Sequence, residues 1–282
     1  NNTIQKDYFL PSLNLKYNLN DKNSLRLGAS KTYTLPQAKE ISPYRYVGVN
    51  FNSQGNPNLK PSDHYNLDLK WDFNPTSTEL ISLTAFYKLI KNPISRIEVA
   101  SAGGYLSYEN IADKATVAGV EVEIRKNLFV RPVSNAAHGM NKLSLGLNGS
   151  YIYTNAKMPL ATVTTGSQLE GAAPWIVNFD LSHNFTKGER SFVNTLVLNY
   201  VSDKIYTIGT QGYQDMMEQG VLTLDFVSQA KLNKHLSLNL KARNLLNPSY
   251  KLSRKANENG EKVILNDYKK GINISLGVSC TF

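Results

Sequence analysis

The sequence predicts an all-β protein, an antiparallel transmembrane β-barrel, because of two patterns. Apolar and polar residues alternate with a period of two through segments of about ten to fourteen residues, as in strands with one apolar and one polar face. The connections between these segments alternate between short and long, as in outer-membrane barrels with tight turns on one rim and long loops on the other. Only 41% of the residues are hydrophobic. No apolar run approaches the roughly 20 residues of a transmembrane helix, so we expect strands to cross the membrane.

The alternation divides the chain into about eleven predicted strands. They cover residues 6–19, 23–34, 63–74, 79–91, 115–128, 142–155, 173–186, 191–204, 221–232, 236–250 and 268–282. The pattern is clearest over 65–73, where odd-numbered residues are apolar or aromatic and even-numbered ones are Asn, Asp or Lys. It recurs over 236–243 and 272–282. A sustained apolar period of 3.6, which would indicate a helix, is absent from the sequence.

The predicted connections also set the register of the strands. Short turns at 20–22, 74–78, 188–189 and 233–235 alternate with long polar loops at 35–62, 92–114, 156–172, 205–220 and 251–267, and the link at 129–141 is intermediate. Gly188 fits the first position of a two-residue type II′ hairpin. That hairpin places Phe185 opposite Phe192 and Leu181 opposite Leu196, and a slip of one residue would mix the two faces.

The two faces of the predicted sheet meet different surroundings. The apolar face should form an outward band of Leu67, Leu69, Trp71, Val120, Val122, Ile124, Phe179, Leu181, Leu196, Leu198, Leu238, Leu240, Ile274 and Leu276. The polar face should line the lumen with Asp68, Lys70, Glu121, Glu123, Arg125, Asp225, Lys241 and Arg243. A register with Phe226 opposite Ala242 brings Asp225 opposite Arg243, which predicts a lumen-facing ion pair.

The number of predicted strands bears on domain organisation. Single-chain bacterial barrels have an even number of strands, whereas about eleven are predicted here. We therefore expect residues 1–282 to be the C-terminal portion of an outer-membrane β-barrel, with the first strands absent.

Four segments resemble motifs of TonB-dependent receptors. Residues 55–61 read GNPNLKP, similar to the family's GNPNLKPE segment, although Ser62 replaces the usual acidic residue. Residues 110–123 resemble the family strand that carries the pattern N, A, GVEVE, and residues 243–250 resemble a strand near the C-terminus. The terminal Phe282 resembles the signal that the barrel-assembly machinery reads. Together these motifs span most of the chain from residue 55 onward.

The resemblance implies a 22-stranded barrel with an N-terminal plug that is absent here, in the bacterial cell outer membrane. Such a receptor binds a scarce extracellular solute, such as an iron chelate, vitamin, glycan or peptide. It imports this solute with energy that TonB delivers through the missing N-terminal part. The implied partners are the ligand, outer-membrane lipids and the barrel-assembly machinery. Two alternatives remain open, a diffusive porin and a soluble carbohydrate-binding β-protein.

The sequence argues against enzymatic and nucleic-acid functions. We find no nucleophile elbow or phosphate-binding loop, so we expect no enzyme. Cys280 is the single cysteine, and the four histidines lack metal-ligand spacing, so we expect no metal and no cofactor. The alternate spacing of Glu121, Glu123 and Arg125 on one strand favours lumen lining over acid–base catalysis. The net charge of +9 is spread along the chain, which favours solvated loops over a nucleic-acid site.

A candidate ligand site lies in the loop 35–62. Its aromatic, amide and basic residues suit a sugar or a chelate, and the candidates are Tyr44, Arg45, Tyr46, Asn50, Phe51 and Asn52. The alternative is an aromatic girdle at the membrane interface together with ordinary loop residues.

Overall fold

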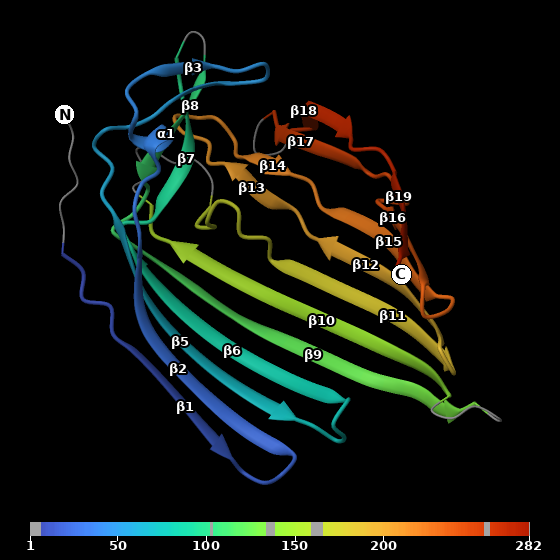
Figure 1. Ribbon diagram of the computed structural model, residues 1–282. Coiled ribbons are helices and arrows are strands. Elements are labelled where there is room, and N and C mark those ends of the chain that lie inside the picture. Colours follow the sequence, from blue (N-terminus) through green and yellow to red (C-terminus); the bar gives the residue numbers. More distant parts are fainter. Residues whose placement is uncertain (1–6, 102–103, 134–138, 159–165, 257–259, 282) are drawn as a thin grey trace.

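The structure is a computed structural model that describes residues 7–101, 104–133, 139–158, 166–256 and 260–281. Eleven long strands form a single curved sheet (Figure 1). They are β1 (Ser12–Asn18), β2 (Asn23–Thr34), β5 (Ser62–Phe73), β6 (Leu80–Lys91), β9 (Lys114–Pro132), β10 (Met140–Ala156), β11 (Trp175–Lys187), β12 (Arg190–Val201), β15 (Val221–Lys231), β16 (Leu236–Arg243) and β19 (Asn273–Cys280).

The curved sheet is antiparallel throughout, and each long strand pairs with the next long strand along the chain. This confirms the eleven predicted strands and the all-β class. Within the described residues, β1 and β19 are the two free edges of the sheet and do not pair with each other. The sheet therefore wraps round as an open wall (Figure 1).

The hairpin between β11 and β12 has the predicted register. Gly188 has φ +61°, whereas Glu189 does not have positive φ, as a type II′ turn requires. Phe185 pairs with Phe192, and their ring centroids lie 6.4 Å apart.

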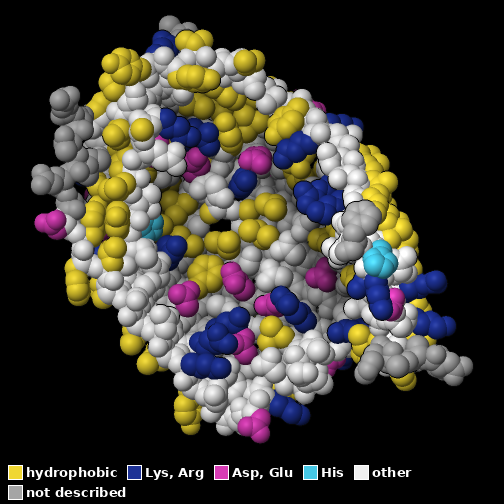
Figure 2. All heavy atoms as spheres, viewed as in Figure 1, with side chains coloured by type: hydrophobic (Ala, Val, Ile, Leu, Met, Phe, Trp, Pro, Cys, Tyr) yellow, Lys and Arg dark blue, Asp and Glu magenta, His cyan; other side chains and the backbone are white. Residues whose placement is uncertain are grey.

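The outward apolar band is also confirmed, because none of its fourteen predicted members is buried. Leu67, Leu69, Val120, Val122, Leu196, Ile274 and Leu276 are exposed. Figure 2 shows acidic and basic side chains within the hollow that the wall surrounds, while apolar side chains follow its outer margins. The alternation of the sequence thus becomes a polar inner face and an apolar outer face.

The predicted ion pair between Asp225 and Arg243 is wrong, although the register behind it is right. Phe226 does pair with Ala242, but the ladder between β15 and β16 ends there. Asn244, with φ 58°, turns the chain away. Its backbone N–H donates to Oδ1 of Asp225 at 2.8 Å. The carboxylate thus binds this turned backbone, and no ion pair joins it to Arg243 in the described part of the chain.

The long loops carry regular structure of their own. One four-stranded sheet contains β3 (Arg45–Val47), β4 (Asn52–Gln54), β8 (Tyr105–Asn110) and β7 (Ile94–Val99), and the short helix α1 (Ala38–Ile41) precedes β3. A second contains β13 (Lys204–Thr207), β14 (Met216–Glu218), β17 (Ser249–Lys255) and β18 (Lys262–Lys269). The predicted strand 236–250 is therefore two strands, β16 and the start of β17. We call these two sheets and the connections packed on them the loop layer.

The buried apolar core of the described chain lies mostly in the loop layer. One cluster contains Ile97, Ile111, Ala112, Ala115, Ala156, Leu169, Ile205 and Ile208, and a smaller one contains Leu106, Met216 and Leu252. A parallel bridge between Ile97 and Ile208 joins the two small sheets. This packing gives the loops fixed positions above the hollow of the wall (Figure 1).

Candidate functional site

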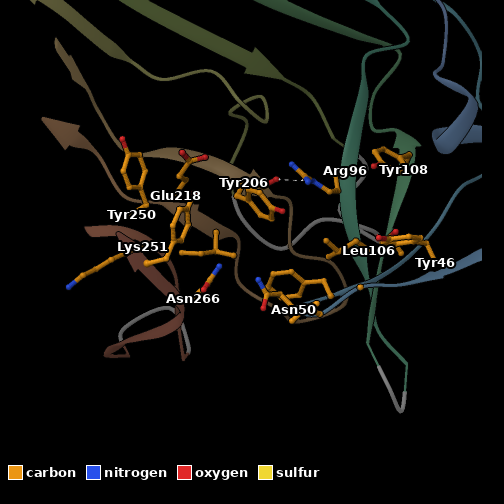
Figure 3. A pocket seen from close by; sticks show the side chains of 16 residues that line it. Tyr46, Asn50, Arg96, Leu106, Tyr108, Tyr206, Glu218, Tyr250, Lys251 and Asn266 are labelled. Carbon is orange, nitrogen blue, oxygen red and sulfur yellow. Dashed lines mark hydrogen bonds between the residues drawn. The ribbon is translucent and has the colours of Figure 1, made fainter. Parts of the chain in front are cut away.

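A cavity of about 450 Å³ opens between the two sheets of the loop layer. Aromatic and charged side chains from both sheets line it (Figure 3). One side is made by β3, by the connection from β3 to β4, and by β7 and β8. The other side is made by β13, β14, β17 and β18. Four connections along the chain thus contribute to one site.

Tyrosines dominate the second side of the cavity. Tyr250 and Tyr268 are cross-strand neighbours of β17 and β18, and their rings stack with centroids 5.4 Å apart. Tyr206 lies 6.4 Å from the ring of Phe51 on the facing side. Aromatic rings with hydroxyl groups offer both an apolar face and a polar edge to a ligand.

Arg96 is the best-anchored cation of the cavity. Its guanidinium lies 4.0 Å from the ring centroid of Tyr206, and its Nε donates to the Tyr206 carbonyl at 3.2 Å (Figure 3). A second guanidinium nitrogen donates to Glu170 at 2.9 Å, and the Arg96 backbone N–H donates to the same carboxylate. These contacts fix the side chain before a ligand arrives, which lowers the entropy cost of binding.

Burial and charge act in opposite directions on the acids near Arg96. Burial raises the pKa of the Glu170 carboxyl, although hydrogen bonds from Arg96 and its charge oppose the shift. Burial also raises the pKa of the Tyr108 phenol, again against the charge of Arg96. Tyr108 is therefore a neutral hydroxyl at ordinary pH.

A second ion pair ties the two small sheets together beside the cavity. Glu98 of β7 accepts from the guanidinium of Arg254 on β17, and the Glu98 carbonyl accepts from the hydroxyl of Thr210. Arg254 also lies 5.2 Å from the ring centroid of Tyr213. Because Arg96 and Glu98 flank the buried Ile97, one short strand holds both ion pairs and part of the core.

The predicted ligand residues are partly brought together. Tyr46, Asn50 and Phe51 line the cavity, and Asn52 lines a neighbouring one of about 340 Å³. Tyr44 is 82% exposed and lines neither cavity. Arg45 also lies outside both, with its guanidinium 5.4 Å from the ring centroid of Tyr105.

Sequence reasoning missed the cavity residues of the other loops. Arg96, Tyr206, Tyr250 and Tyr268 lie in three separate connections, far apart in the sequence. A signal that points to them is the tyrosine count, 16 against 10 phenylalanines, although a count places no tyrosine in a particular loop.

The predicted lumen residues lie on the face opposite the exposed apolar band. On β5, the Asp72 carboxylate lies 3.4 Å from Lys70 Nζ and 3.3 Å from Arg26 Nε. On β9, Arg125 lies 2.8 Å from Glu123. The register continues this polar face across the wall, since Asp68 pairs with Gly28, Glu121 with Ser150, and Lys241 with Ser275. Phe282 lies outside the described residues.

Two negative observations hold for the described residues. No group of three or more His, Cys, Asp or Glu side chains is placed to hold a metal ion. None of the described helices has the length and apolar character needed to cross a membrane.

The chain is similar to known receptors over most of its length. Residues 1–245 match the family described as "TonB dependent receptor-like, beta-barrel". The iron-regulated outer membrane virulence protein of Vibrio cholerae serotype O1 is 25% identical over 228 residues, which are 77% of this chain and 32% of that protein.

Solved structures share the fold at lower identity. A mutant of the ferric enterobactin receptor from Pseudomonas aeruginosa, in complex with enterobactin, superposes with a TM-score of 0.59 at 18% identity, over 97% of this chain and 40% of that one. The ferric yersiniabactin uptake receptor from Yersinia pestis superposes with a TM-score of 0.59 at 15% identity. The match covers 97% of this chain and 37% of that receptor. The chain thus spans less than half the length of the relatives it matches.

Proposed function

Because this chain belongs to the TonB-dependent receptor family of bacterial outer-membrane β-barrels, we propose that its loop layer binds a scarce extracellular solute for import. The cavity between the two small sheets is the single observation that carries this proposal. Its volume of about 450 Å³ is typical of a small-molecule site, and its mixture of rings and a few placed polar groups is typical too.

The cavity chemistry favours an anionic chelate with aromatic groups over a neutral glycan. Tyr206, Tyr250 and Tyr268 present ring faces and hydroxyls, and the preorganised Arg96 supplies positive charge. The V. cholerae relative is iron-regulated, and the two solved relatives are ferric siderophore receptors by name. An iron chelate is therefore the first candidate solute, ahead of a vitamin, glycan or peptide.

We also propose that the wall is completed by further strands and a plug, and that TonB drives import. The two free edges of the sheet support the first part, because a strand edge cannot remain unpaired within the hydrocarbon core of a bilayer. The lengths of the relatives leave room for such additions. Family membership supports receptor and transport activity rather than catalysis.

Binding by the intact receptor tests the site, with ferric enterobactin and ferric yersiniabactin as the probes. We expect Arg96→Ala and Tyr206→Ala each to weaken binding of the preferred chelate at least tenfold. Tyr44→Ala is the matched control, because this exposed loop tyrosine lies outside the cavity. Unchanged binding in both cavity variants would rule out this site.

Uptake by whole cells separates active transport from a diffusive porin. We expect accumulation of the labelled ferric chelate against its gradient, and loss of that accumulation when an uncoupler collapses the inner-membrane proton gradient. A porin would admit the chelate equally with and without the uncoupler.

A further inference from the structure

Among the described residues that line the solute cavity, Glu218 is the only acidic side chain. We propose that the imported chelate carries a protonated amine, which Glu218 binds, in addition to the acceptor groups that Arg96 binds. This inference rests on the proposed solute site and concerns its specificity. A carboxylate at this position disfavours a solute that is anionic throughout, because like charges brought together at a binding site cost affinity.

The cavity offers one positive and one negative group at separate places. Arg96 of β7 lies against the ring of Tyr206, and Figure 3 shows Glu218 of β14 on the other side of Tyr206. The carboxylate within 4 Å of Arg96 is that of Glu170, and no ion pair joins Arg96 to Glu218 in the described part of the chain. A single solute can therefore contact both charges.

One oxygen of Glu218 remains available to a ligand. Its Oε2 lies 3.4 Å from the ammonium of Lys204, the residue opposite it on β13. Lys204 lines a smaller neighbouring cavity of about 150 Å³ and not the solute cavity, whereas Glu218 lines both. Oε1 accepts no hydrogen bond from any residue that the structure describes. Because a carboxylate accepts at both oxygens, Oε1 can take a donor from the solute.

The cations that line the solute cavity are already paired with other acids. Arg96 lies 2.9 Å from Glu170, and Lys251 lies 3.7 Å from Asp267. In Figure 3 the ammonium of Lys251 points away from Glu218. A solute without a donor near Glu218 would remove water from Oε1 and replace it with nothing, which costs affinity. An ammonium group of the solute would both donate to Oε1 and balance its charge.

Binding of matched ferric chelates to the intact receptor tests the ammonium contact. One pair of probes is ferrioxamine B, which ends in a free amine, and its N-acetylated form, which keeps the iron-binding groups but loses the positive charge. The second pair is an amine-bearing ferric tris-catecholate and its N-acetylated form. Hydrogen bonds to charged groups contribute about ten- to a hundredfold in affinity. We expect the wild type to bind the amine form about tenfold more tightly in the pair that fits the cavity, and Glu218→Gln to bind both forms equally.

Two further variants separate the ligand contact from the ion pair with Lys204. Lys204→Gln breaks that ion pair but keeps the carboxylate, so it should keep the preference for the amine form. Glu261→Gln removes an exposed carboxylate of the same loop layer, between β17 and β18, and should behave as the wild type. An equal loss of the preference in Lys204→Gln and Glu218→Gln would overturn the proposal, because it would assign the effect to the packing of β13 on β14. Equal affinity of the wild type for the amine and acetylated forms of both pairs would overturn it as well.

Arg96→Ala distinguishes failure of the ammonium contact from failure of the solute site. If Arg96→Ala weakens binding of both forms while Glu218→Gln leaves the preference unchanged, the solute site stands and the ammonium contact is wrong. If neither pair of chelates binds, or if Arg96→Ala leaves binding unchanged, the proposed chelate site fails and the ammonium contact fails with it.

Discussion

The long-stranded wall and the loop layer obey different rules. In the wall every strand pairs with the next long strand, and one alternating pattern repeats along all of them. In the loop layer, core residues such as Ile97, Leu169 and Ile208 come from separate connections and meet only in three dimensions. The fold of the wall is therefore encoded by an alternating pattern that recurs in every strand. The loop layer depends on a few contacts, each of which should have a large and local effect.

Ile208→Ala should produce the largest effect. Ile208 is 1% exposed, and its backbone N–H and C=O bond the Arg96 carbonyl and the Glu98 N–H across the two small sheets. A buried Ile→Ala change costs about 2–5 kcal/mol through lost burial and the cavity left behind. We expect faster hydrogen exchange in β7 and β13 and weaker solute binding, with the wall unchanged.

The control for this variant is Ile264→Ala, because Ile264 lies in the same layer on β18 and is 46% exposed. It should leave hydrogen exchange in β7 close to wild type. Equal protection of β7 in both variants would show that the loop layer does not depend on the contact between Ile97 and Ile208.

Leu69→Arg tests whether the apolar face of the wall is in contact with lipid. Leu69 is 51% exposed on the outward band, midway between Tyr65 and Phe73. An arginine at the bilayer midplane of a barrel costs about 2–4 kcal/mol. Urea unfolding of the intact protein folded into liposomes should show this loss. Val47→Arg, in the exposed strand β3 of the loop layer, should change the free energy of unfolding by less than about 0.5 kcal/mol.

The contrast also explains which features the sequence could predict. The eleven wall strands, the register at Gly188 and the outward face of Leu67 and Leu69 follow from a two-residue period that any ten-residue segment reveals. Six of the eight strands in the loop sheets have only three to six residues, which is too short for the same signal. Arg96 and Tyr250 share a cavity only because the wall brings distant loops together. Tyr46, Asn50 and Phe51 were found because they happen to lie in one loop.

Asp225→Ala tests the place where the wall departs from the predicted pattern. The Asp225 carboxylate accepts from the N–H of Asn244, which has φ 58°. Loss of this charge-assisted bond should cost roughly 1–2 kcal/mol in urea unfolding of the liposome-folded protein. Arg243→Ala should cost much less, because no ion pair joins the two side chains in the part of the chain that the structure describes. Equal losses of unfolding free energy in the two variants would indicate that Asp225 and Arg243 do form an ion pair.

Glu170→Gln should produce the smallest effect, and its sign depends on pH. Burial raises the pKa of Glu170 above its usual value of 4.5, with Arg96 opposing. A carboxyl with a raised folded-state pKa contributes stability below its unfolded pKa and loses that contribution as pH rises through the folded value. The wild-type loop layer should therefore lose stability relative to the Gln variant as pH rises from about 4.5 through the raised folded-state pKa of Glu170, as measured by hydrogen exchange corrected for intrinsic rates.

The opposite pH dependence can be measured in the same experiment. The sign shows whether the contact between Arg96 and Glu170 stabilises the loop layer or only positions Arg96. If the wild type gains stability relative to the Gln variant as pH rises, the ion pair between Arg96 and Glu170 outweighs the cost of burying the charged carboxylate. The loop layer would then gain stability from that charge pair. If the wild type loses, as we expect, Glu170 serves to hold the guanidinium of Arg96 against Tyr206 at some cost in stability. A trade of stability for a preorganised guanidinium is characteristic of a binding site.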